Sequence, residues 1–224
     1  MLRTLFLSAL LCVGYAQLRV ESIENAETLM SVPPQTVTEL DVPAYLGNWF
    51  QMYASLIPTH TYELDGYCIT AQYIAIQSEA GTTFKIVNSE NIGSPNGKHK
   101  QITGVATNVW KDKQLPVGQF IVKFDGNEDI DFYWIIALGP IENGQYSWSV
   151  VSTPFAVDLF ILARDPKTFE DKYEVDVLAL VKSKGFDKFY NKPIPTPQSS
   201  QCQYPFVAAV EAGQGALRAR VGLF

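Results

Sequence analysis

The residue types that most often catalyse reactions or bind metals are scarce in this sequence. Its two histidines, His60 and His99, fall in separate loop or strand-edge settings, so a metal site would need carboxylates from elsewhere in the chain. A Gly-X-Ser-X-Gly turn, which would present a nucleophilic serine, does not occur. We therefore expect a protein without enzymatic activity and without a metal centre.

One acidic run has the composition of a calcium-binding loop: Asp125-Gly126-Asn127-Glu128-Asp129-Ile130-Asp131. An EF-hand loop requires glycine at its sixth position and glutamate at its twelfth, where this run offers Ile130 and Ile136. We interpret the run as a polar hairpin turn.

The N-terminus has the features of a secretory signal peptide. Residues 1–16 contain Arg3, an apolar run from Leu5 to Val13 and small residues before a predicted cleavage after Ala16. The run is roughly half the length of about 20 residues that crosses a membrane. We expect a secreted, extracellular protein without a membrane span.

Charge and cysteine content narrow the partners and the compartment. A formal net charge of −6 at pH 7 argues against nucleic acid as a partner. Cys12 falls in the predicted leader, which leaves Cys68 and Cys202 as an even pair in an oxidising compartment. The count predicts one disulfide between them, with two unpaired thiols as the alternative.

The rest of the chain divides into an extension, a folded region and a tail. Residues 17–38 include Pro33-Pro34 and little periodicity, which indicates an N-terminal extension. Residues 39–202 form the predicted domain. The tail at 203–224 is interpreted as a flexible end, with receptor contact through its two arginines as the alternative.

The folded region breaks into short segments rich in aromatic and β-branched residues, separated by turn residues. This pattern predicts an all-β fold, either an up-and-down barrel or a sandwich. The expected strands lie near 48–56, 67–77, 82–90, 99–110, 118–125, 131–138, 145–153 and 157–164.

One helix is expected after the last strand. Asp165-Pro166 supplies an N-cap and a first-turn proline, and Gly185 ends the segment. Four apolar residues recur every four positions and define a face that must be covered, namely Phe169, Tyr173, Val177 and Val181.

The strands indicate where that helix packs. Residues 132–136 and 146–151 are largely apolar on both faces, whereas 83–86 and 119–124 largely alternate. A strand that is apolar on both faces is covered on both faces. We expect the helix outside the sixth and seventh strands, with Trp134 and Trp148 among its contacts.

Three motifs occur in the order typical of one family: Asp41-Val42-Pro43-Ala44-Tyr45-Leu46-Gly47-Asn48-Trp49-Phe50, Asp65-Gly66-Tyr67-Cys68-Ile69-Thr70-Ala71-Gln72-Tyr73 and Ile161-Leu162-Ala163-Arg164-Asp165-Pro166. Over about residues 39–202 the chain resembles the lipocalins, in particular the branch of apolipoprotein D and the bacterial outer-membrane lipocalins. The resemblance implies an eight-stranded antiparallel barrel with one C-terminal helix packed outside.

The resemblance also assigns structural roles. It implies that Arg164 lies across Trp49 at the barrel floor, that Gly47 leaves room for close approach, and that Cys68 pairs with Cys202. One motif differs from the family pattern, because Leu138-Gly139-Pro140 and a lengthened loop to Gly144 replace the usual Thr-Asp-Tyr. This departure puts the geometry of that turn in question.

The family's strand parity implies an aromatic, uncharged barrel lining. The expected inward residues are Tyr73, Phe84, Ile86, Phe120, Val122, Phe124, Tyr133, Ile135 and Phe160. Such a lining suits a retinoid, bilin, carotenoid, steroid or fatty acid, with the Tyr73 and Tyr133 hydroxyls orienting a polar end.

The resemblance thus implies a carrier or pigment-binding protein that requires no cofactor, although a chromophore or lipid could be its bound ligand. The alternative is a protein-interaction module whose barrel interior is filled with side chains. An enzyme acting on a bound lipid through a free pocket cysteine is disfavoured, because Cys68 is expected to be oxidised. Homo-oligomerisation stays open.

Overall fold

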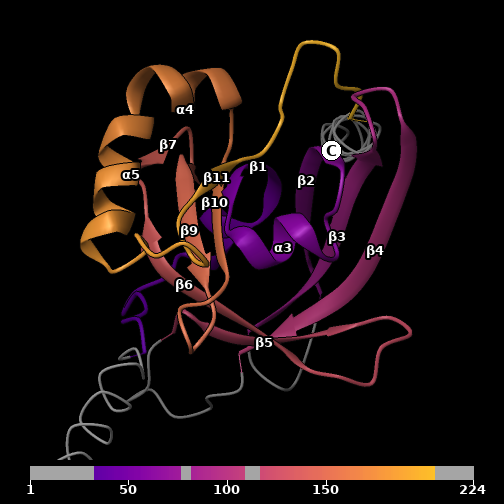
Figure 1. The fold of residues 1–224 in the computed structure, drawn as a ribbon. Helices are drawn as coiled ribbons and strands as arrows, with labels where there is room; N and C mark the ends of the chain where they lie inside the picture. Colours follow the sequence, from indigo (N-terminus) through magenta and orange to yellow (C-terminus); the bar gives the residue numbers. More distant parts are fainter. Residues whose placement is uncertain (1–32, 77–81, 109–116, 205–224) are drawn as a thin grey trace, which may run out of the picture. The chain divides into compact units, whose positions relative to one another are not determined.

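The computed structural model describes residues 33–76, 82–108 and 117–204. Within them, eight antiparallel strands close into a barrel (Figure 1). The strands are β1 (Gly47–Ala54), β2 (Gly66–Ala75), β3 (Thr83–Ile92), β4 (Lys98–Thr107), β5 (Gln119–Phe124), β6 (Asp131–Leu138), β9 (Trp148–Ser152) and β10 (Leu159–Ala163). Because β10 also pairs with β1, the sheet has no open edge there, and the predicted fold class is confirmed.

The predicted strands agree with the observed ones to within a few residues. The main difference is the expected strand 145–153, which is divided between two short strands, β8 (Gln145–Tyr146) and β9. The predicted ends at residue 77 and residues 109–110 lie outside the described residues.

The lengthened turn after β6 forms a small hairpin of its own. β7 (Ile141–Glu142) pairs with β8, and the two residues between them, Asn143 and Gly144, have φ angles of 53° and 81°. Two consecutive positive φ angles are typical of the tight turns that join hairpin strands, and asparagine followed by glycine adopts them readily. The sequence change that departs from the family motif therefore encodes a hairpin.

The hairpin is attached to the outer helices. The Glu142 carboxylate accepts hydrogen bonds from the Lys172 ammonium and from the Tyr173 hydroxyl, each at 2.6 Å. The last residue of one outer helix, Lys172, and Tyr173 just after it are thereby tied to the strand β7.

The expected helix consists of two consecutive segments, α4 (Pro166–Lys172) and α5 (Glu174–Ser183). The Asp165 carboxylate accepts from the Thr168 backbone N–H at 2.7 Å, as an N-cap does. Gly185, with φ of 91°, follows the end of α5. The segment boundaries match the prediction, apart from the break at Tyr173.

The helices cover the barrel wall through one apolar cluster. Phe169, Val177 and Val181 are buried there against residues of β6 and β9, with Trp134 and Trp148 packed beside them. The same cluster includes Met52 of β1 and Ile161 of β10, so the covered area is wider than the sixth and seventh strands. Among the described residues, none of the helices has the length and apolar character to cross a membrane.

Two short helices flank β1. α2 (Val42–Tyr45) precedes it and begins at Asp41, whose carboxylate caps the Ala44 backbone N–H at 3.1 Å. α3 (Leu56–His60) follows it and leads into the loop before β2. Upstream of α2, the Val37 backbone N–H donates to the Ile135 carbonyl at 2.9 Å, so contacts with the barrel begin within the predicted extension.

The segment after the helices pairs with the end of β1 and bridges β1 and β2 where their own pairing has ended. β11 (Ile194–Pro195) pairs with the end of β1. The Gln198 amide then donates to the carbonyls of Gln51 and Ile69, which belong to β1 and β2. At the end of this segment, Cys202 is bonded to Cys68 with their Cα atoms 5.5 Å apart, which confirms the predicted disulfide.

Removing the disulfide should weaken the fold considerably. The bond joins residues separated by 134 positions, and closing a loop of that length stabilises a chain by about 5 kcal/mol in the chain-entropy account. We expect Cys68→Ser/Cys202→Ser to lower the free energy of unfolding by about that amount in urea titrations. Reduced wild-type protein is the control and should match the variant. Equal stability of variant and oxidised wild type would contradict this account.

Candidate functional site

The barrel encloses a cavity of about 430 Å³. Six of the predicted inward residues line it: Tyr73, Ile86, Val122, Phe124, Tyr133 and Phe160. The other three, Phe84, Phe120 and Ile135, are almost fully buried in the cluster that fills the barrel beside the cavity. The interior is therefore divided into a packed part and an open part.

The expectation of an uncharged lining is wrong for one half of the cavity. Four carboxylates and one ammonium contribute to its wall, together with several uncharged polar groups. The charged residues are Glu63, Glu90, Asp131, Asp158 and Lys100. The apolar part of the lining, here called the apolar waist, consists of Ile69, Ile86, Val122, Phe124, Phe160 and Leu162.

Two of these carboxylates had a signal in the sequence, Glu90 on β3 and Asp131, which shares the inward parity of Tyr133 on β6. Phe84, Ile86, Asn88 and Glu90 alternate along β3, so the parity that points Phe84 and Ile86 inward also points Asn88 and Glu90 inward. The family resemblance directed attention to the apolar positions, and the polar continuation of the same row was missed. Glu63 and Asp158 come from loops, where no periodicity identifies the direction of a side chain.

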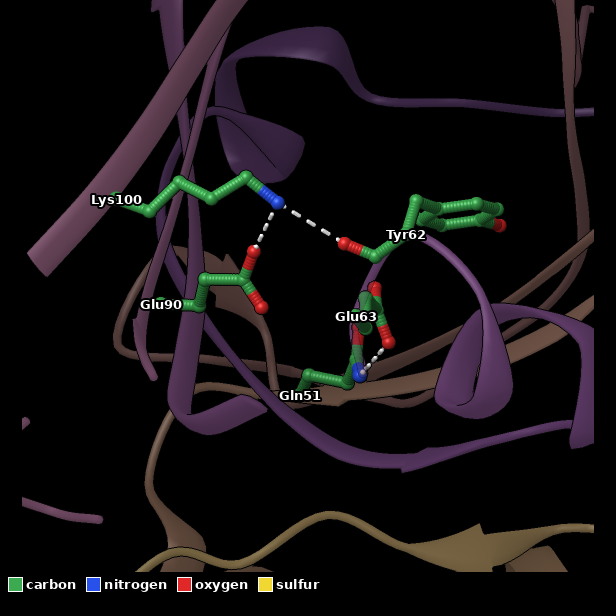
Figure 2. A network of polar contacts seen from close by, with 5 residues as sticks. All are labelled: Gln51, Tyr62, Glu63, Glu90 and Lys100. Atoms are coloured by element: carbon green, nitrogen blue, oxygen red, sulfur yellow. Dashed lines mark hydrogen bonds and ion pairs between the residues drawn. The ribbon is translucent and has the colours of Figure 1, made fainter. Parts of the chain in front are cut away.

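The polar half is organised by two small networks, shown in Figure 2. The Lys100 ammonium donates to the Glu90 carboxylate at 2.7 Å and to the Tyr62 carbonyl at 3.0 Å. The Gln51 amide donates to the Glu63 carboxylate at 2.8 Å. Lys100 thus ties β3 and β4 to the loop after α3, while Gln51 ties that loop to β1.

Several acceptors in this half have no donor. Among the described residues, five buried side-chain oxygens lack a hydrogen-bond partner, and three of them belong to cavity-lining residues: Asn88 Oδ1, Glu90 Oε2 and Asp158 Oδ1. A buried acceptor without a donor costs roughly 1–3 kcal/mol, more for a charged one. The cavity wall is therefore deficient in donors.

Burial also shifts the ionisation of these acids. Desolvation, with the nearby Glu90 charge, raises the pKa of Glu63 to about 7 against the opposing hydrogen bond from Gln51. Desolvation likewise raises the pKa of Asp158 and of Asp131, each of which also has another aspartate nearby. Near neutral pH, Glu63 is the group most readily switched between its neutral and charged forms.

A chain of hydroxyls lies at the other end of the apolar waist. Tyr133 contacts the Tyr45 hydroxyl at 2.5 Å and the Tyr73 hydroxyl at 2.8 Å, and Tyr45 continues to Ser149 at 3.1 Å. Burial raises the pKa of Tyr45 to about 12 and those of Tyr73 and Tyr133 well above their ordinary value, so all three phenols are neutral. The four hydroxyl groups have four protons for three contacts, so one of them keeps a free donor. When that group is Tyr73, its hydroxyl can donate to a molecule in the cavity.

Below the tyrosines, Arg164 closes the barrel floor. Its guanidinium lies 3.5 Å from the centre of the Trp49 ring. It also donates to five backbone carbonyls, those of Ala44, Tyr45, Leu46, Asn48 and Tyr146. Desolvation lowers the pKa of Arg164 to about 10, which leaves it charged at neutral pH.

Gly47 is required by the same contact. Its φ is 101°, and a β-carbon there would meet the Gln145 amide at 2.8 Å and the Arg164 guanidinium at 3.4 Å. Any larger residue would therefore be strained and would also displace the Gln145 side chain, which donates to the Leu46 carbonyl beside the arginine.

The remaining candidate residues form no second site. His60 Nδ1 contacts the Leu56 carbonyl within α3, and His99 Nδ1 contacts Asn91. In the acidic run, the Asp129 backbone N–H donates to the Asn127 side chain, as in a polar turn. The part of the chain that the structure describes contains no cluster of three or more metal-ligating side chains.

Replacing Arg164 should destabilise the floor. Arg164→Met keeps much of the apolar stem but removes the cation over Trp49 and the donors to five carbonyls. We expect the free energy of unfolding to fall by about 3 kcal/mol, measured by urea denaturation. Lys167→Met, on the exposed face of α4, is the control and should have little effect. A loss no larger than that of the control would contradict the assigned role.

The raised pKa of Glu63 predicts a pH-dependent stability. The folded protein holds the Glu63 proton up to about pH 7, whereas the unfolded chain releases it near the ordinary value of 4.5. The folded state then binds more protons than the unfolded state, so this group lowers stability as the pH rises from 4.5 to 7. We expect Glu63→Gln, compared with wild type, to be relatively more stable at pH 8 than at pH 5 in chemical denaturation. A difference between the two proteins that is the same at both pH values would contradict this assignment.

The comparisons with known proteins agree with this architecture. Residues 40–193 match the Lipocalin-like domain family. Insecticyanin from the tobacco hornworm Manduca sexta superposes with a TM-score of 0.55 at 19% identity, over 78% of this chain and 89% of that one. Lobster apocrustacyanin A1 gives a TM-score of 0.51 at 16% identity, over 80% and 96%.

A third solved structure is the tryptamine complex of the amine binding protein of Rhodnius prolixus. It superposes with a TM-score of 0.51 at 17% identity, over 80% of this chain and 93% of that one. No curated protein sequence matches the chain. The family match spans most of the sequence and the closed barrel has the corresponding fold, so the chain belongs to the lipocalin family.

Proposed function

We propose that this lipocalin is a secreted carrier that binds one small hydrophobic molecule inside its barrel. The observation that carries the proposal is the cavity of about 430 Å³ with its apolar waist. Small-molecule sites are typically concave, largely apolar and roughly 300–1,000 Å³ in volume, with a few polar groups that orient the ligand. The Tyr73 hydroxyl and the carboxylates at the other end supply such groups.

The open cavity favours a carrier over an interaction module with a filled interior. Only part of the barrel is packed with side chains, and the residues above the packed part leave room for a ligand. The β7–β8 hairpin, which the alternative would use as a contact surface, is already tied to Lys172 and Tyr173.

We propose binding without turnover. Cys68 is held in the disulfide, so it offers no free thiol for chemistry on a bound lipid. No cofactor is needed for binding, and a bound chromophore or lipid would be the ligand itself. The motifs at 65–73 and 161–166 support placement in the apolipoprotein D-like branch, and the leader at 1–16 with the disulfide supports secretion.

The cavity also narrows the ligand classes. Its volume lies toward the lower end of the usual range, which favours a retinoid or steroid over a long carotenoid. Several carboxylates in the wall would repel the head group of a fatty acid.

A cavity-filling variant tests the proposal. We expect retinol, progesterone, biliverdin or dodecanol to bind wild-type protein at one molecule per chain in isothermal titration calorimetry. Val122→Trp places a large ring in the cavity and should weaken that binding at least about tenfold, because the ring occupies the ligand's volume.

Lys123→Trp is the matched control, since it places the same ring on the exposed face of the same strand. Its affinity should equal that of wild type. Flat titrations with all four probes, or equal binding by Val122→Trp, would overturn the proposal.

A further inference from the structure

The charges that line the cavity are strongly asymmetric. Four carboxylates face it, from Glu63, Glu90, Asp131 and Asp158, whereas Lys100 is the one cationic residue among the described lining. Lys100 is paired with a single oxygen of Glu90, and about half of its side chain is exposed, at 53%. One cation therefore faces up to four negative charges, and the wall has an unbalanced negative potential.

The hydrogen-bonding groups of the cavity wall are unbalanced as well, because acceptors without a donor outnumber free donors among its described buried side-chain atoms. The unpartnered buried atoms of the cavity wall, Asn88 Oδ1, Glu90 Oε2 and Asp158 Oδ1, are all acceptors. The Glu90 side chain is only 10% exposed, so bulk water provides little compensation. The missing component is a donor, preferably a charged one.

The polar groups are spaced for a molecule with a distinct head and body. Ile86 pairs with Tyr73 across the sheet, and Glu90 lies four residues further along β3, which is about 13 Å at 3.3 Å per residue. On the neighbouring strand β2, the lining residues Ala71 and Ile69 follow Tyr73 over the same interval, so that part of the wall between the two levels is apolar. A ligand could place its body in the waist and its head among the carboxylates.

We propose that the cavity selects hydrophobic molecules that end in a protonated amine, with the ammonium bound among Glu63, Glu90 and Asp158. This inference rests on the proposed function and specifies the ligand class of the same cavity. An ammonium provides three donors and one positive charge, which meets both deficiencies of the wall. A carboxylate head group would meet neither.

Lys100 has a defined role in this arrangement. Its ammonium occupies part of the site that a ligand amine would share, through the 2.7 Å contact with Glu90. Removing the lysine charge should therefore strengthen amine binding, whereas removing a carboxylate should weaken it.

A matched series of ligands tests the proposal directly. Dodecylamine, dodecanol and dodecanoate have one aliphatic body and differ in the head group. In isothermal titration calorimetry at pH 8, we expect dodecylamine to bind at least about tenfold more tightly than dodecanol, and dodecanoate to bind most weakly. An amine affinity equal to or below that of dodecanol would overturn the proposal.

The three ligands also separate the two proposals. Equal binding of dodecylamine and dodecanol would overturn the amine preference and leave the carrier function supported. No binding by any of them, nor by retinol, progesterone or biliverdin, would overturn both.

Four variants locate the head group. Glu90→Gln and Asp158→Asn should each weaken dodecylamine binding about fivefold and leave dodecanol binding unchanged. Lys100→Gln should strengthen dodecylamine binding, an effect that damage to the fold would not produce. Glu170→Gln, on the outer helix α4, is the control and should change nothing. Equal effects of the two cavity variants on amine and alcohol would contradict the assigned head-group site.

The pH dependence gives an independent readout. The groups around the head-group site are Tyr62 and Glu63 of the loop, Glu90 of β3, Lys100 of β4, Asp131 of β6 and Asp158 just before β10. Because the pKa of Glu63 is about 7, its charge develops between pH 6 and pH 8, while an alkylammonium with a pKa of about 10.4 stays protonated. Dodecylamine affinity should rise over that interval in wild type and stay flatter in Glu63→Gln. Identical pH profiles would contradict the role of Glu63.

Discussion

The arginine that lies across Trp49 is the contact on which the organisation of the barrel interior depends. Its cation faces the indole ring, and its donors bind the carbonyls at the end of α2 and in the segment just after it. The Trp49 ring nitrogen donates to the Tyr45 carbonyl at 3.0 Å, so the same contact fixes α2 across the barrel end. Tyr45 in turn holds Tyr133 through their hydroxyls. The contact at the floor therefore fixes the positions of Tyr45 and Tyr133, which limit the depth of the cavity.

Above that floor, the interior changes from neutral hydroxyls through an apolar waist to carboxylates. The packed rings of Phe84 and Phe120 fill the space beside the tyrosines, which leaves the open volume near the polar half. The loop after α3 lines this half, while the segment around Gln198 holds β1 to β2 through the Gln51 and Ile69 carbonyls and is anchored by the disulfide. The barrel strands supply the apolar surface and three of the charged lining residues, Glu90, Lys100 and Asp131, whereas loops supply Glu63 and Asp158.

Much of this arrangement could be predicted, because it depends on local patterns or short motifs. Alternation and turn residues identified the strands, the Asp165-Pro166 pair identified the helix start, and two remaining cysteines identified the disulfide. The carboxylates from loops could not be placed, because a loop has no period that fixes which way a side chain points. The β7–β8 hairpin was missed because its strands have only two residues each. The division of the interior into packed and open parts depends on how rings from several strands fit together.

Native mass spectrometry of protein isolated from its natural source tests the central claim most directly. The account predicts one small molecule per chain, with a hydrophobic body and a basic nitrogen, that is released when the protein unfolds. A chain that carries no small molecule, or that carries an anionic lipid in the barrel, would contradict it.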